Sequence, residues 1–194
     1  MRYLYFTTLL FILLGCAHST TAVKGLREVI ERMPEKKPGW IVHLPSPKNG
    51  RVYVIGTRTR GTTMEDARYD AYQMALRNAA VLAQDKIKSI FERARTEMGI
   101  PEDDKDIGFV LNDMMRAVSK VKIEGAKEED AYYEKYKEMT KSGISYFYDF
   151  YVLVSVPSES IDRAAFSAIE REQRREDLNQ RAAKLLEEMR KNIE

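Results

Sequence analysis

Few side chains in this 194-residue chain could do nucleophilic chemistry, because it has one cysteine, Cys16, and two histidines, His18 and His43. Covalent catalysis needs a nucleophile with a base held beside it. His18 lies among small polar residues and His43 lies close to prolines, so neither is well placed to be that base. We therefore expect no catalytic residue and no cofactor site, and we interpret His43 as a polar residue of an extended segment.

One acidic cluster is a candidate for metal coordination, and it contains Glu102, Asp103, Asp104 and Asp106. The cluster lacks the glycine and the terminal glutamate of an EF-hand loop at the required spacing. We therefore expect no metal site, and we interpret the cluster as a solvated connection or the start of a helix.

Residues 1–15 have the organisation of a signal peptide, with a basic start, a largely apolar run over residues 4–14, and the small Gly15 before Cys16. The run is about eleven residues long, whereas a helix needs about twenty to span a bilayer. No intramolecular disulfide can use Cys16, since it is the only cysteine. The segment Leu13-Leu14-Gly15-Cys16 resembles the lipobox of bacterial lipoproteins.

In such lipoproteins the cysteine sulfur takes a diacylglycerol, and the new amino terminus is acylated after cleavage, with chains such as palmitate. The resemblance implies that Cys16 is lipidated and holds the mature protein on a membrane, facing the periplasm. Ala17 follows, where an aspartate commonly marks retention in the inner membrane, so we expect the outer membrane. The cell surface and the inner membrane are alternative locations, and an ordinary secreted protein is the competing interpretation.

Residues 16–38 are predicted to form a tether. Its first part, residues 17–22, is small and polar like a flexible spacer. Apolar residues then recur at helical spacing, which predicts a short amphipathic helix that ends before Pro34 and packs on its own domain or lies on the membrane surface. These residues are Leu26, Val29, Ile30 and Met33.

The composition is typical of a soluble globular protein, with 44% hydrophobic residues, 32 Lys and Arg, 30 Asp and Glu, and a formal net charge of +2. It gives no indication of a nucleic-acid partner. About 180 residues follow the leader, which suits one domain and a tether. We place the domain at residues 39–170 and a charged helical extension at residues 171–194.

A strand and two helices are predicted in the first half of the domain. Residues 52–56 have the composition of a strand. A capping box at Thr62 and Glu65 predicts the start of a long helix, and a short helix is expected over residues 107–114. Alanines recur every fourth residue along the long helix, which would let its backbone approach a sheet closely. These are Ala67, Ala71, Ala75, Ala79 and Ala83.

Strands and a final helix are predicted in the second half. Val121 and Ile123 alternate with lysines and predict a half-buried strand. Residues 131–139 and 146–156 predict a hairpin that turns at residues 141–143. The order of all these elements predicts an α+β two-layer domain, with a mainly antiparallel sheet and the long and C-terminal helices on one face.

The final helix is expected to begin at Ser158 and to run nearly to Glu194. In its second half four apolar residues have coiled-coil spacing over less than two heptads. We interpret them as packing against their own domain rather than against a second chain. They are Leu178, Ala182, Leu185 and Met189.

Four segments together resemble the Lpp-twenty-like lipoproteins, a family of small envelope proteins whose domain is similar to the N-terminal part of a flagellar basal-body ring protein. The resemblance covers residues 39–169. It implies a non-enzymatic envelope module, associated in several members with the cell surface or flagellar machinery, and no family catalytic residue exists to transfer. The segments are Gly39-Trp40, Tyr53-Val54-Ile55-Gly56, Glu65-Asp66-Ala67-Arg68 and the aromatic strand over residues 148–156.

Aromatic residues crowd into the hairpin, and alternation must point some of them away from the helices. We predict a possible partner surface at Tyr132, Tyr133, Tyr146 and Tyr148, since exposed tyrosines are favoured at interfaces. The alternative is a sheet face shielded by cross-strand aromatic pairs.

The expected function is therefore a lipid-anchored binding or scaffolding lipoprotein that faces the periplasm and holds an envelope protein partner near the membrane. The alternative is a carboxylate-dependent envelope hydrolase acting on cell-wall or glycan material. Asp149 would be its central residue, because an acid within an apolar strand can suit a general-acid role.

Overall fold

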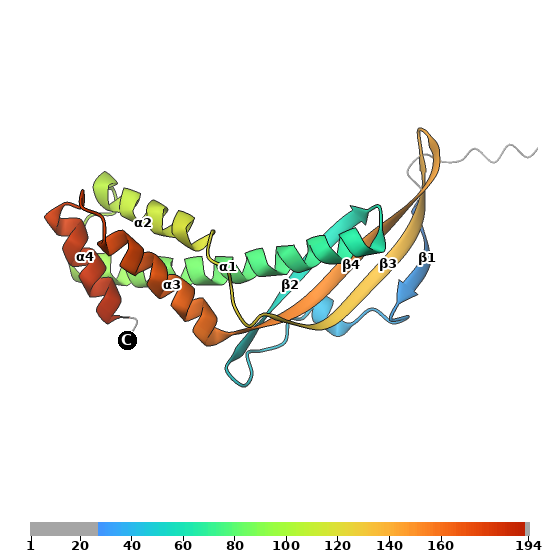
Figure 1. Ribbon diagram of the computed structural model, residues 1–194, viewed down its shortest axis with the longest axis horizontal. Coiled ribbons are helices and arrows are strands. Elements are labelled where there is room, and N and C mark those ends of the chain that lie inside the picture. The colour runs from blue at the N-terminus through green and yellow to red at the C-terminus, as the bar shows by residue number, and fades with distance from the viewer. Residues whose placement is uncertain (1–26, 193–194) are drawn as a thin grey trace, which may run out of the picture.

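The structure, a computed structural model, describes residues 27–192. In this part of the chain a four-stranded antiparallel sheet, in the order β1-β3-β4-β2, is combined with four α-helices (Figure 1). The predicted α+β two-layer class is confirmed. The elements are β1 Arg27–Met33, a 3-10 turn Gly39–Ile41, β2 Arg51–Gly61, α1 Met64–Glu97, α2 Lys105–Val118, β3 Lys127–Thr140, β4 Gly143–Pro157, α3 Ser158–Gln173 and α4 Gln180–Lys191.

The centre of the sheet is the predicted hairpin of β3 and β4, whose last paired residues are Thr140 and Gly143. Gly143 has a positive φ of 115°, a backbone conformation that glycine adopts without a Cβ penalty. On the face that carries the helices, Phe150, Val152 and Val154 are buried and point toward α1. Residues of opposite parity in β4 point to the other face, which we call the far face.

Helix α1 packs on β2 and β4 through its alanine stripe, all five members of which are buried as predicted. The helix begins one residue later than expected, because Thr63 is the cap and its Oγ1 accepts a hydrogen bond of 3.1 Å from the backbone N–H of Asp66. A Cβ on Gly56 of β2 would lie 1.8 Å from the carbonyl oxygen of Ala71. Gly56 and the alanines together therefore allow the helix backbone to lie directly on the strand.

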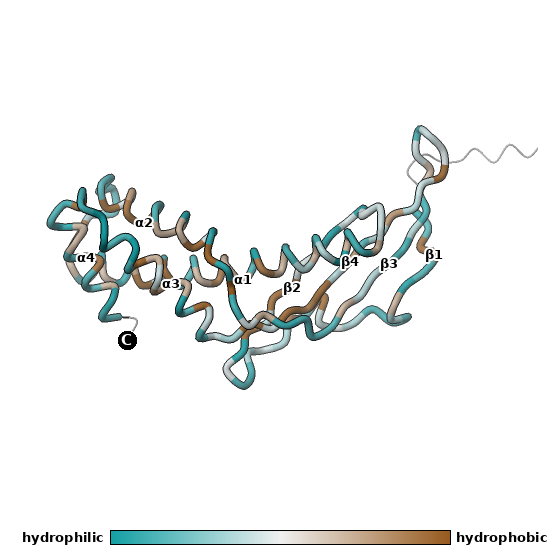
Figure 2. The backbone as a smooth tube through the Cα atoms, viewed as in Figure 1, coloured by the Kyte–Doolittle hydropathy of each residue, from teal (hydrophilic) through white to brown (hydrophobic). Residues whose placement is uncertain are grey.

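The molecule is elongated, and α1 runs through both of its halves (Figure 1). With 34 residues, α1 is about 51 Å long. Its first half covers the sheet, and its second half packs against α2, α3 and α4. Along the helices hydrophobic and hydrophilic residues alternate, as Figure 2 shows. The hydrophobic residues of the four helices pack together in this helical cluster. Its buried members include Ile87, Phe91, Ile107, Met114, Ile169, Leu185, Leu186 and Met189.

The helix predicted between Leu26 and Met33 is wrong where the structure describes it, because residues 27–33 form the edge strand β1. Val29 pairs with Tyr136 of β3, more than 100 residues later, so a long-range ladder supplies the hydrogen bonds that a short isolated helix could not sustain. All seven residues are exposed. The earlier part of the tether lies outside the described residues.

Two further predictions in the second half are corrected. Ile123 is buried in the core, but residues 119–126 form turns and irregular backbone, so the strand predicted at Val121 and Ile123 is wrong. The single final helix is also wrong, because α3 ends at Gln173 and α4 begins after Asn179, whose side chain accepts a hydrogen bond of 2.8 Å from the N–H of Ala182.

The break lets α4 fold back on its own domain, where its apolar side contacts α1, α2 and α3. The predicted packing of Leu178, Ala182, Leu185 and Met189 is confirmed, since three of them are buried and Leu178 is partly buried. The apolar side of α4 therefore belongs to the core of the domain, whereas most residues of the segment 171–192 are exposed or half-buried.

Candidate functional site

The expected lipidation residue, Cys16, lies outside the described residues, as does His18. The first described residue, Arg27, pairs with Glu138 of β3, close to the turn of the β3–β4 hairpin. Any tether that precedes Arg27 therefore joins the domain at this end of the sheet. Within residues 27–192, no helix has both the length and the apolar character that crossing a bilayer requires.

The four tyrosines of the predicted partner surface do not share one face. Cross-strand pairing places Tyr133 opposite Phe150, on the helix side of the sheet, and strand alternation places Tyr146 and Tyr148 on that side too. Tyr132 pairs with Tyr151 on the far face. The prediction is wrong for Tyr132, which is 0% exposed.

The buried Tyr132 has a structural environment. Its hydroxyl donates a hydrogen bond of 2.7 Å to Glu134, and its ring centroid lies 5.9 Å from that of Tyr151. Burial, with the neighbouring Glu134 carboxylate, raises the pKa of Tyr132 to about 12. The segment that follows β1 also contributes to this face, since the Lys37 ammonium lies 5.4 Å from the centroid of Tyr151. The structure therefore supports the alternative interpretation for Tyr132, in which a cross-strand aromatic pair shields the sheet.

Asp149, the acid singled out as a possible general acid, also lies on the far face and is 6% exposed. Its Oδ2 accepts a hydrogen bond of 2.6 Å from Arg27 of β1, and its Oδ1 accepts one of 3.0 Å from the backbone N–H of Arg60 in β2. Arg60 has a positive φ of 57° at an irregularity in the pairing of β2 and β4. Asp149 thus connects the two edge strands of the sheet.

The Arg27 guanidinium crosses over β3 to reach Asp149. Its central carbon lies 3.6 Å from the centroid of Tyr136, whose ring is fully buried beneath it. Burial raises the pKa of Tyr136, and its hydroxyl is the one buried side-chain polar atom of the described residues that has no hydrogen-bond partner. Among these residues, no group of acidic, histidine or cysteine side chains is arranged to hold a metal ion.

On the helix side, α1 lies over β2 and β4 and leaves the β3 half of the sheet largely uncovered. Tyr133 stacks on Phe150, with centroids 5.8 Å apart, and its hydroxyl donates to Glu31 of β1. This bond and partial burial raise the pKa of Tyr133 to about 12. Tyr148 packs beside Tyr133 at 6.1 Å, so both rings are held in fixed positions.

A groove of about 310 Å³ lies between α1 and β3, and it is lined by Glu65, Arg68, Tyr69, Tyr72 and Glu128. Tyr69 and Tyr72 of α1 form its wall, and Tyr69 is 64% exposed. Across the groove Arg68 and Glu128 form an ion pair of 2.7 Å. Tyr69 and Tyr72 were not among the predicted site residues, although their spacing of three residues on one side of the alanine stripe places them on the same flank of the helix.

We call Tyr69, Tyr72, Tyr133 and Tyr148 the aromatic face. Its four rings come from one helix and two adjacent strands, and the ring packing on Phe150 fixes part of it. Such an array is suited to burying area against a partner through ring surfaces and to forming hydrogen bonds through hydroxyl groups.

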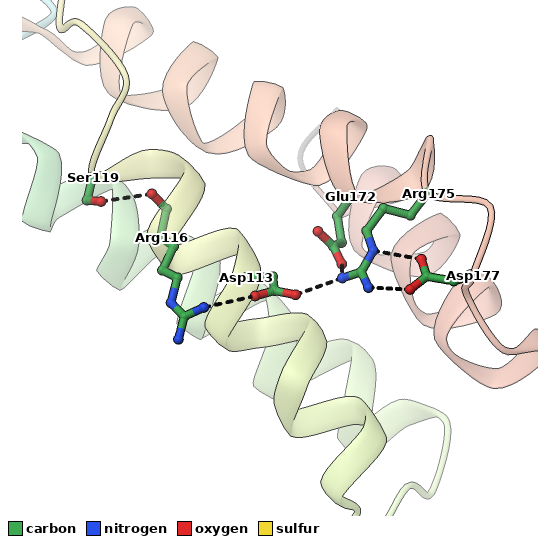
Figure 3. A network of polar contacts seen from close by, with 6 residues as sticks. All are labelled: Asp113, Arg116, Ser119, Glu172, Arg175 and Asp177. Carbon is green, nitrogen blue, oxygen red and sulfur yellow. Dashed lines mark hydrogen bonds and ion pairs between the residues drawn. The ribbon is translucent and has the colours of Figure 1, made fainter.

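A polar network connects the helices at the other end of the molecule (Figure 3). Arg175, in the loop between α3 and α4, binds Asp177 in a bidentate manner, Glu172 at 2.6 Å and Asp113 of α2 at 2.7 Å. Burial raises the pKa of Glu172. One guanidinium therefore joins α2, α3 and the loop, and these contacts fix the position of the loop that leads into α4. In the sequence this region is only a run of charged residues, and the partners Asp113 and Arg175 are 62 residues apart.

No model of a known protein family, no curated protein and no solved structure matches this chain. The resemblance to the Lpp-twenty-like lipoproteins therefore remains a prediction from the quoted residues.

Proposed function

We propose that the protein is a lipid-anchored scaffolding lipoprotein of the bacterial envelope, which faces the periplasm and binds an envelope protein through its aromatic face. The observation that carries the binding part is that α1 covers only half of the sheet and leaves the aromatic face beside it. The signal-peptide organisation, the lone Cys16 and the resemblance to an envelope lipoprotein family support the location.

The chemistry of the aromatic face favours a protein as the bound molecule. Tyrosine combines a large ring area with a polar tip, and it is enriched where proteins meet. The rings of Tyr133 and Tyr148 are already packed, so little side-chain entropy remains to be lost on binding. The ion pair of Arg68 and Glu128 gives a partner both charges to match at the groove.

Mass spectrometry of the protein purified from its native envelope tests the anchor. We expect a mature chain that begins at Cys16 and carries a diacylglycerol on its sulfur. The Cys16→Ser variant should remain uncut and should lack the acyl mass. Normal membrane attachment of that variant would contradict the proposed anchor.

Photo-crosslinking in living cells tests the partner surface. A benzophenone side chain in place of Tyr69 should capture one protein of defined mass, since this position is exposed at the rim of the groove. The matched control is Phe109 of α2, an aromatic residue that is 66% exposed at the other end of the molecule. Equal capture at both positions, or none at Tyr69, would show that the aromatic face is not the binding surface.

A further inference from the structure

The turn end of the β3–β4 hairpin, residues 139–147, extends past both neighbouring strands. The last described pair between β1 and β3 is Arg27 with Glu138, and the last pair between β2 and β4 is Gly61 with Tyr148. Within the described part of the chain, residues 139–144 therefore form a two-stranded ribbon that no third strand supports, whereas residues 145–147 lie at the edge of the sheet and pair with β3 alone. Figure 1 shows this ribbon projecting from the end of the sheet that is opposite to the helical cluster. We call residues 139–147 the hairpin tip.

The composition of the hairpin tip differs from that of the rest of the chain. Among its nine residues Lys141 is the one charged side chain and no acid occurs, whereas charged residues make up 32% of the whole sequence. Ile144 is 59% exposed and Tyr146 is 52% exposed. Strand alternation places both on the same side of the ribbon. The hairpin tip thus presents an exposed aliphatic and an exposed aromatic side chain on the same side.

Two lysines belong to the same end of the hairpin. The Lys135 ammonium lies 5.8 Å from the ring centroid of Tyr146, and Lys141 occupies the turn itself. Within residues 27–192, neither lysine forms a salt bridge, in contrast to Lys137, which pairs with Glu28 at 2.8 Å. Tyrosine rings and lysine chains with charged ends are the side chains that proteins place at the boundary between lipid and water. The tip therefore combines an apolar end with cations that anionic headgroups attract.

The place where the chain enters the domain limits what the tip can reach. Ten residues separate Cys16 from Arg27, and such a segment spans at most about 40 Å when fully extended. The tip continues beyond Arg27 from the same end of the sheet. If Cys16 carries lipid, the tip is thus held close to the bilayer, and this tethering raises the effective concentration of an otherwise weak contact.

We propose that the hairpin tip contacts the membrane that holds the anchor, with Ile144 and Tyr146 in the headgroup region of a phospholipid bilayer and Lys135 and Lys141 facing lipid phosphates. This inference rests on the proposed lipid anchor. Contact at the tip and at the lipid gives the domain two attachment points, directs the sheet toward the bilayer and directs the helical cluster away from it.

Photo-crosslinking to lipid tests the tip in the full chain in its native envelope. A benzophenone side chain in place of the exposed Ile144 should add the mass of a phospholipid after irradiation, and the same side chain in place of Phe109 should not. Capture of a partner protein or a second copy at position 144 overturns the proposal, and so does the absence of any lipid product there.

A charge reversal tests the headgroup contact. Lys141→Glu should lower the yield of the lipid product at position 144 several-fold, because a carboxylate in the turn repels anionic headgroups. Lys88→Glu, at an exposed position of α1, is the matched control and should leave the yield unchanged. An unchanged yield in Lys141→Glu overturns the assignment of this lysine.

The mass of the N-terminus, measured on the same samples, separates the two proposals. A chain without acyl groups contradicts the proposed anchor. In that case the crosslinked product at position 144 still shows whether the tip contacts lipid. An acylated chain without a lipid product at position 144 contradicts the tip alone.

Discussion

Gly56 determines how closely α1 lies on the sheet, and it gives a prediction at the scale of a single residue. In Gly56→Ala the new Cβ would meet the carbonyl oxygen of Ala71 and, at 2.5 Å, the backbone nitrogen of Ala75. These are backbone atoms, so the helix itself must shift. Overpacking of this kind costs about 1–3 kcal/mol, and we expect the upper part of that range for the free energy of unfolding in urea.

Gly108→Ala is the matched control for this measurement. A Cβ at this position inside α2 meets nothing within 4 Å. Alanine stabilises a helix interior by up to about 1 kcal/mol relative to glycine. If Gly56→Ala lowers the free energy of unfolding by no more than the size of the change in Gly108→Ala, α1 and β2 are not in direct backbone contact.

Glu172 gives a prediction about pH. Burial raises the pKa of Glu172 above its ordinary value of 4.5, so the folded state holds the proton more tightly than the unfolded state. The contribution of this group to stability is therefore complete below pH 4.5 and is lost as the pH rises through the folded-state pKa. Glutamine does not titrate, so the stability of Glu172→Gln relative to the native chain should improve from pH 4 to pH 7.

Chemical denaturation at several pH values measures this difference. Glu176→Gln, at an exposed position of the same loop region, serves as the control. The measured quantity is the difference in the free energy of unfolding between Glu172→Gln and the native chain. If this difference stays constant with pH, or changes in the opposite direction, the burial of this carboxyl group is contradicted.

At the scale of elements, α4 is expected to stabilise its own domain. Leu185 is fully buried in the helical cluster. Leu185→Ala should therefore lower the free energy of unfolding by about 2–5 kcal/mol, through lost transfer energy and a cavity. The loss should not depend on protein concentration, because the contacts of α4 lie within one chain.

Leu82→Ala provides the same chemical change at an exposed position of α1, and it should cost much less. Thermal unfolding at two protein concentrations completes the test. A transition temperature of the native chain that rises with concentration would favour the coiled-coil interpretation of α4 instead.

The elements that the sequence predicted are those whose patterns are local. The alanine stripe and the β3–β4 hairpin depend on neighbours within the same segment, and both are confirmed. β1 was not predictable from its own residues, since Val29 and Met33 fit a helical face equally well and the deciding partner, β3, is about a hundred residues away.

The candidate site was predictable only in part, for a related reason. Side chains alternate between the two faces along a strand, so the sequence predicts that Tyr132 and Tyr133 point to opposite faces. It does not tell which face is covered, because that depends on where α1 crosses the sheet and where the segment after β1 lies. The break at Arg175 was hidden too, because the acidic partner Asp113 belongs to another helix.

At the scale of the whole molecule, α1 makes the sheet and the helical cluster one cooperative unit. Its buried residues run continuously from Ala67 at the sheet to Ala94 among the helices. We expect the fluorescence of Trp40, which lies beside β3 and donates a hydrogen bond of 2.7 Å to Asp130, to change in the same urea transition as the far-UV circular dichroism of the helices.

Trp40 is the single tryptophan of the chain, so its fluorescence reports on the sheet half alone. Coincident midpoints are the expected result for both the native chain and Leu185→Ala. Two separated transitions, with the helical signal lost first in Leu185→Ala, would show that the halves unfold independently.

The position of β1 has a mechanical consequence. The strand enters the sheet at Arg27, opposite Glu138, and runs antiparallel to β3 as far as Met33, opposite Tyr133. A pull on Arg27 along the strands, toward the turn of the hairpin, is directed across the inter-strand hydrogen bonds, which are perpendicular to the strands. All of these bonds, together with the ion pair of Arg27 and Asp149, then carry the load at once in shear instead of peeling apart in sequence. Tension applied to Arg27 along this direction therefore meets the sheet in its mechanically resistant direction.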